Sequence, residues 1–127
     1  MERDIHIIKY VLEEIERLQK NTEPIQIQFD ETDSYSIESL KYHLNLLFED
    51  GSISGKNNYG IGDNEYISLV SFITNKGHDL LDSLRNEKAI DMAEEEANKR
   101  GSNLSDLPID VAKGLLITAL NKIFYLE

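Results

Sequence analysis

Apolar residues recur at steps of three and four through residues 3–20, the spacing of a helix that buries one face. The stripe consists of Ile5, Ile8, Val11, Leu12, Ile15 and Leu18. Asn21–Pro24 should end this helix, because a proline disfavours helical backbone at the residue before it. In Pro24–Asp30 apolar and polar residues then alternate, which predicts a short edge strand with one buried face.

A second helical pattern runs from Ser36, a favourable N-cap residue, to Gly51, which tolerates the left-handed conformation at a helix end. Its predicted buried residues are Ile37, Leu40, Leu44, Leu47 and Phe48. Between Ser52 and Thr74, two β-rich runs flank the loop sequence NNYGIGDN, whose asparagines and glycines favour a turn. This segment is predicted to be a β-hairpin, and Thr74 can cap the helix that follows it.

Three more helices are predicted after the hairpin, in NKGHDLLDSLRN, in EKAIDMAEEEANKRG and between Pro108 and Tyr125. The order helix, strand, helix, hairpin, helices predicts a mainly α (α+β) fold, a winged helix-turn-helix. Its first helix-turn-helix helix is missing or cut to one turn, because only Glu31–Ser36 is left for it. We predict a winged-helix domain over residues 1–86 and a C-terminal helical extension over residues 87–127.

Four stretches of the sequence resemble a family of small bacterial and phage proteins that is catalogued only as a domain of unknown function. They are RDIHIIKYVLEEIE, IESLKYHLNLLFEDGSI, ITNKGHDLLDSLRN and LPIDVAKGLL. The segment HLNLLFEDGSI also resembles the end of the recognition helix in winged-helix repressors. The resemblance implies a winged-helix fold in a prophage or mobile-element setting, and it supplies no activity, substrate or functional residue.

The composition narrows the possible functions. The chain has no cysteine, which excludes disulfides and thiolate metal sites and fits a reducing, cytoplasmic compartment. Its start mixes charged and apolar residues, unlike a signal peptide, and no apolar run approaches the ~20 residues that span a bilayer. Catalytic motifs are absent, and His6, His43 and His78 lie far apart on predicted helices. We therefore expect no enzyme, no metal and no cofactor, and a structural role for His43.

The net charge of −11 counts against DNA binding, because affinity for DNA comes largely from Lys and Arg, and no segment of the chain is net basic. The side chains that could still contact double-stranded DNA lie on the second helix and in the hairpin. They are Ser39, Lys41, Tyr42, Asn45, Lys56, Asn57, Asn58 and Tyr59. On the outer face of the same helix, Tyr42 and Leu46 form an apolar pair, which usually requires cover from the chain itself or from a partner protein.

The last helix is apolar on nearly every side, so other parts of the protein or a partner must cover more than one of its sides. It can pack onto the rest of the chain, or it can form a homodimer. The candidate dimer interface is Leu115, Leu116, Leu120, Ile123 and Phe124. Two functions remain open. The resemblance favours a DNA-binding transcriptional regulator, which we place first, and the charge favours a protein-interaction module on the same scaffold that does not bind DNA.

Overall fold

The computed structural model describes residues 1–32, 34–59 and 66–125, and of residues 58, 59, 66 and 67 it describes the backbone alone. The elements are α1 (Ile5–Leu18), β1 (Ile25–Ile27), α2 (Ile37–Asp50), β2 (Ile53–Tyr59), β3 (Tyr66–Ile73), α3 (Asn75–Leu84), α4 (Glu87–Lys99), the short 3-10 helix η1 (Leu104–Asp106) and α5 (Ile109–Tyr125). This order confirms the predicted mainly α, α+β fold, including the strands between Ser52 and Thr74.

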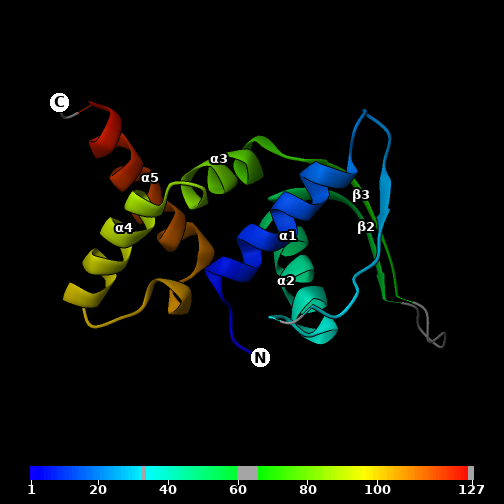
Figure 1. The fold of residues 1–127 in the computed structure, drawn as a ribbon, viewed down its shortest axis with the longest axis horizontal. Coiled ribbons are helices and arrows are strands. Elements are labelled where there is room, and N and C mark those ends of the chain that lie inside the picture. Colours follow the sequence, from blue (N-terminus) through cyan, green and yellow to red (C-terminus); the bar gives the residue numbers. More distant parts are fainter. Residues whose placement is uncertain (33, 60–65, 126–127) are drawn as a thin grey trace.

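The three strands form one antiparallel sheet in the order β1-β3-β2, so β1 lies at an edge as its proline-led sequence predicts. Ile25 of β1 pairs with Val70 of β3, and Ile53 of β2 pairs with Ile73. The sheet lies at one end of the molecule, α4 and α5 lie at the other, and α1 and α2 lie between them (Figure 1).

The described residues between β1 and α2 (28–32 and 34–36) contain no helix, which confirms the missing first helix of the helix-turn-helix pair. A turn takes its place. The Tyr35 amide donates a hydrogen bond to Thr32 Oγ1 (2.8 Å), and the Tyr35 ring packs against Tyr10 of α1 with 5.3 Å between ring centroids. The chain therefore reaches α2 directly from the strand.

The helix boundaries follow the predicted caps. Ser36 Oγ accepts the Ser39 amide (3.2 Å) at the start of α2, and Thr74 Oγ1 accepts the Gly77 amide (3.2 Å) at the start of α3. Gly51 ends α2 with a φ of 82°, in the left-handed region that glycine adopts without strain.

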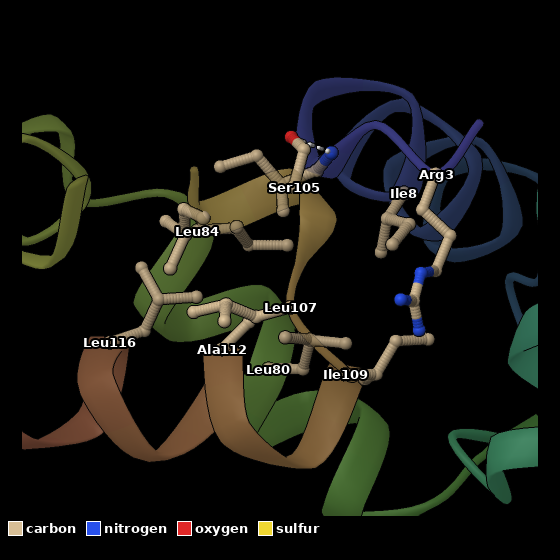
Figure 2. A pocket seen from close by; sticks show the side chains of 11 residues that line it. Arg3, Ile8, Leu80, Leu84, Ser105, Leu107, Ile109, Ala112 and Leu116 are labelled. Carbon is tan, nitrogen blue, oxygen red and sulfur yellow. Dashed lines mark hydrogen bonds between the residues drawn. The ribbon is translucent and has the colours of Figure 1, made fainter. Parts of the chain in front are cut away.

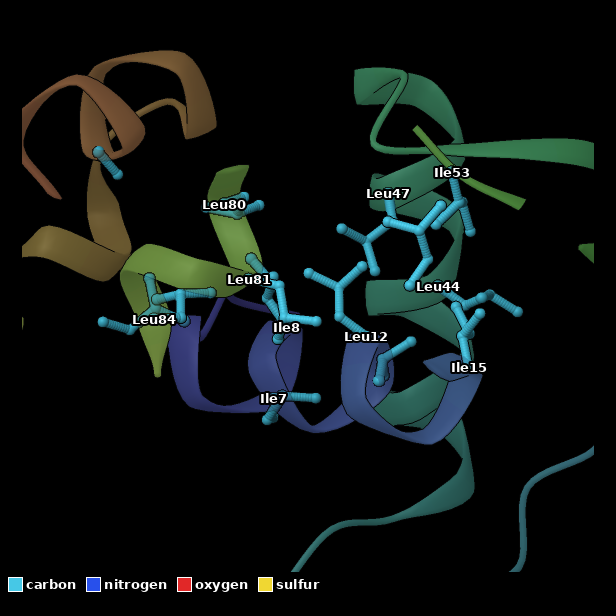
Figure 3. Close-up of a cluster of buried hydrophobic side chains, with 14 of the residues drawn as sticks. Ile7, Ile8, Leu12, Ile15, Leu44, Leu47, Ile53, Leu80, Leu81 and Leu84 are labelled. Atoms are coloured by element: carbon cyan, nitrogen blue, oxygen red, sulfur yellow. The ribbon is translucent and has the colours of Figure 1, made fainter. Parts of the chain in front are cut away.

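Leucine and isoleucine side chains from α1, α2 and α3 meet in the core (Figure 3). The labelled side chains of this cluster are Ile7, Ile8, Leu12, Ile15, Leu44, Leu47, Ile53, Leu80, Leu81 and Leu84. Each helix contributes one stripe, and burying these stripes against one another is the main source of stability for such a fold.

The core continues across residue 86 into the C-terminal helices. Leu116 of α5 is fully buried and faces a gap of only about 10 Å³, close to the size of one water molecule, between α1, α3, η1 and α5 (Figure 2). The Ile5 amide donates a hydrogen bond to Ser105 Oγ (3.3 Å) at the edge of this seam. No break in packing therefore marks the domain boundary predicted after residue 86, which stays a prediction.

Candidate interaction surface

The outer face of α2 carries an apolar pair bracketed by two carboxylates. Glu38, Tyr42, Leu46 and Glu49 follow one another at steps of four, four and three, so they form one stripe along the helix. Glu38 and Glu49 are exposed, whereas Tyr42 and Leu46 are half-buried. This stripe, called here the docking face, has an apolar centre and an acidic border.

The chain itself provides part of the cover that the Tyr42–Leu46 pair was expected to need. An open hollow of about 320 Å³ lies beside the pair. Its other walls are Met1–Arg3 and the η1 residues Ser105 and Asp106. The Arg3 guanidinium donates a hydrogen bond to the Asp106 carbonyl (3.3 Å), which joins these two walls across 103 residues of sequence. The pair thus lies in a partly covered depression rather than on an open ridge.

His43 lies next to Tyr42 and is fully buried. Its Nε2 accepts the Asp4 backbone amide (2.9 Å), so the ring proton lies on Nδ1, which donates to the Ser39 carbonyl (2.7 Å). Burial lowers the pKa of His43, while the bond to the Ser39 carbonyl and the Asp4 carboxylate act in the opposite direction. The histidine is neutral and joins the start of α1 to α2, the structural role that was predicted.

Two of the predicted DNA-reading amides are bonded to each other. Asn57 of β2 donates to Asn45 Oδ1 (2.7 Å), and Asn45 donates to Glu49 Oε1 (3.2 Å). Ser68 of β3 donates to Asn57 Oδ1 (2.8 Å). This chain of side-chain hydrogen bonds ties the hairpin to α2, so both amides have a structural task that the sequence did not reveal.

The other predicted DNA contacts differ in how exposed they are. Ser39 and Lys41 are half-buried on α2, and Lys56 is exposed on β2. The side chains of Asn58 and Tyr59 lie outside the described residues.

Two further basic side chains form ion pairs with carboxylates. Lys76 pairs with Asp50 Oδ1 (3.1 Å) and Asp110 Oδ1 (3.0 Å), and hydrogen bonds to Asp110 and Asp50 raise its pKa. Arg17 pairs with Glu14 (2.8 Å). These charges are therefore partly neutralised before any phosphate approaches.

The candidate dimer residues on α5 do not share one environment. Leu116 is fully buried in the chain's own core, so it has no surface for a second copy, and the prediction for this residue was wrong. Leu115, Leu120 and Ile123 are half-buried, and Phe124 is 67% exposed. Among these candidates the most exposed side chain is thus Phe124, at the C-terminal end of α5.

Among the described residues, no group of three or more His, Asp or Glu side chains could hold a metal ion. Within the same part of the chain, no helix is long and apolar enough to cross a membrane.

Comparison with known proteins connects this fold to one family. The family model described as hypothetical protein (DUF2513) matches residues 2–103. The chain belongs to this family. The match covers α1 to α4, with the docking face, and confirms the resemblance to a domain of unknown function. DUF2513 therefore supplies no activity to transfer. No curated protein and no solved structure matched the chain.

Proposed function

We propose that the chain is a non-enzymatic protein-interaction module on a winged-helix scaffold, and that the docking face of α2 binds its partner. The observation that carries this proposal is the half-buried Tyr42–Leu46 pair between Glu38 and Glu49, beside a hollow. An apolar centre within a polar rim is the usual anatomy of a protein–protein interface. A cytoplasmic setting, expected from the absence of cysteine, is part of the proposal.

The charge around the docking face indicates the chemistry of the partner. Glu38, Glu49, Glu2 and Asp106 border it, and Arg3 is a cation that lines the hollow, in a chain whose net charge is −11. Complementary charge speeds encounter and disfavours wrong partners. The partner segment therefore presents an apolar side chain flanked by Lys or Arg.

A prophage or mobile-element DNA-binding regulator is the second candidate. The strand order β1-β3-β2 and the exposed Lys56 on β2 favour it. However, insertion of α2 into a major groove would carry Glu38 and Glu49 toward phosphates, and the chain offers few cations to offset that repulsion. We therefore place it behind the interaction module.

We expect no saturable binding of fluorescently labelled double-stranded genomic fragments at micromolar protein, even at about 50 mM salt, where phosphate contacts are strongest. Fluorescence anisotropy measures this directly. Saturable binding that Lys56→Ala weakens for every DNA sequence would instead establish DNA binding. It would also show that the hairpin contacts phosphates.

Glu38→Lys should weaken binding to a peptide that carries leucine or phenylalanine between basic residues by about tenfold, because it reverses a charge at the rim. The measurement is a titration against the best binder from an array of such peptides. Peptides with acidic residues in place of the basic ones are the negative controls. Asp91→Lys is the matched control, because it makes the same charge change at an exposed site on α4. Equal effects of the two reversals would mean that the docking face is not the site.

We propose in addition that the C-terminal end of α5 forms a homodimer, through Leu120, Ile123 and Phe124. Phe124 is exposed, Leu120 and Ile123 are half-buried, and apolar surface of this kind is commonly buried by a closed two-fold contact. Phe124→Glu should then halve the mass measured by light scattering while the helical circular dichroism stays unchanged. A monomer mass for the unmodified chain at high micromolar concentration would discard the dimer.

A further inference from the structure

The N-terminal arm, Met1–Asp4, is held across one side of the docking face by a small number of polar contacts. The Arg3 guanidinium donates to the Asp106 carbonyl (3.3 Å), and at the far end the Asp4 amide donates to His43 Nε2 (2.9 Å). Met1, Glu2 and Arg3 themselves form a wall of the hollow beside Tyr42 and Leu46. Where the arm lies thus decides how much of the apolar pair a partner can reach.

The contact between Asp4 and His43 depends on the protonation state of the imidazole. Neutral His43 uses Nε2 as an acceptor, because Nδ1 already donates to the Ser39 carbonyl (2.7 Å). A protonated ring would present N–H at both nitrogens, so Nε2 would face the Asp4 amide as donor against donor. The ring is fully buried, so water cannot solvate the added charge unless the surrounding chain moves.

The charged and titratable groups around this contact come from each element that meets there. Asp4 lies at the start of α1, Tyr42 packs edge-on against the imidazole with 5.2 Å between ring centroids, and Glu2, Arg3 and Asp106 line the hollow. Asp4 is the carboxylate whose charge acts on His43, and its side chain already accepts the His6 amide (2.8 Å) as the cap of α1. An imidazolium could draw this carboxylate away from the cap, which would also loosen the arm.

We propose that His43 is a latch for the docking face: the neutral imidazole holds the N-terminal arm closed, and its protonation releases the arm and opens the Tyr42–Leu46 pair to a partner. The identity of the face rests on the proposed function, whereas the opening of the arm is a property of this chain alone and can be measured without a partner.

The direction of the response follows from the lowered pKa of His43. The closed form binds the proton more weakly than a free histidine, whose pKa is about 6.5, so closure is fully present above that pH. Between about pH 6.5 and the lowered pKa of the closed form, each unit of acidification favours the open arm by about tenfold. Below the lowered pKa the effect is complete.

Hydrogen–deuterium exchange of the intact chain, corrected for the intrinsic effect of pH, tests the latch. Between about pH 7.5 and about pH 5, the protection of the first turn of α1 should fall, while that of α4 stays unchanged. His43→Gln, whose amide is neutral at every pH, should abolish the response. His6 is an exposed histidine in the first turn of α1, and His6→Gln should retain the response.

Three results would overturn the proposal: no change in the wild-type chain, an equal response in His43→Gln, or a parallel loss of protection in α4, which would mean global unfolding. The imidazole titration of wild-type His43, followed by nuclear magnetic resonance, needs no variant, and its midpoint must lie below about 6.5, within the pH range where protection is lost. If Glu38→Lys and Asp91→Lys changed peptide binding equally, the docking face would be rejected, whereas the proposed role of His43 in closing the arm would be unaffected.

Discussion

Leu116→Ala is expected to lower the free energy of unfolding of the whole chain by about 3 kcal/mol, the usual cost of replacing a fully buried leucine with alanine. Leu116 lines the seam between α5, α3, α1 and η1, so the cavity would open between the C-terminal helices and the winged helix rather than inside either. We therefore expect one cooperative transition, shifted as a unit.

Urea unfolding followed by circular dichroism and by tyrosine fluorescence measures this effect. Val111→Ala is the matched control on the same helix, because its side chain is 50% exposed and its loss leaves no cavity. Two separate transitions, with the loss confined to one, would show instead that residues 1–86 and 87–127 unfold as independent domains.

Gly77→Ala is expected to cost about 3 kcal/mol, at the upper end for overpacking of a well-packed site. A Cβ atom at Gly77 would lie 2.0 Å from the Ser52 carbonyl oxygen and 2.7 Å from Cγ2 of Ile73. The Ser52 carbonyl cannot easily move away, because it accepts the Thr74 amide (3.0 Å) at the junction of β2 and α3. The start of α3 must therefore shift or part of the junction must open.

Gly114→Ala is the matched control, since a Cβ at this position in α5 would meet nothing within 4 Å. It should stabilise the chain by about 0.5–1 kcal/mol through helix propensity alone. Thermal unfolding of both variants gives the comparison. A neutral Gly77→Ala would show that the close approach of α3 to β2 is not a constraint on the fold.

The junction at Gly77 also matters for the docking face. Thr74 Oγ1 donates to the Gly51 carbonyl (2.6 Å), and Lys76 joins Asp50 at the end of α2 to Asp110 at the start of α5. These contacts join the end of α2 to the starts of α3 and α5. The η1 residues Ser105 and Asp106 line the hollow beside Tyr42 and Leu46.

Local features of the fold were predictable because they act over a few residues. The caps at Ser36 and Thr74 bond an amide three residues later, and Gly51 is recognisable by its own conformational freedom. Asp4 and Asn86 also cap helices, and the same rule could have identified them. The candidate site was only half predictable. The helical spacing of Tyr42 and Leu46 can be seen in the sequence, whereas nothing in the sequence shows which distant segments lie beside them.

The sequence by itself determined the helices, the hairpin, the edge strand and the acidic character of this protein, because periodicity, caps and net charge need no knowledge of distant residues. Only the tertiary structure decided that Leu116 faces inward, that Asn57 bonds Asn45, and that Arg3 and Asp106 meet beside Tyr42. The physical reason is that burial and side-chain pairing depend on which surfaces of distant elements come together. A helix that is apolar on several sides, such as α5, leaves that choice open until the rest of the chain has packed against it.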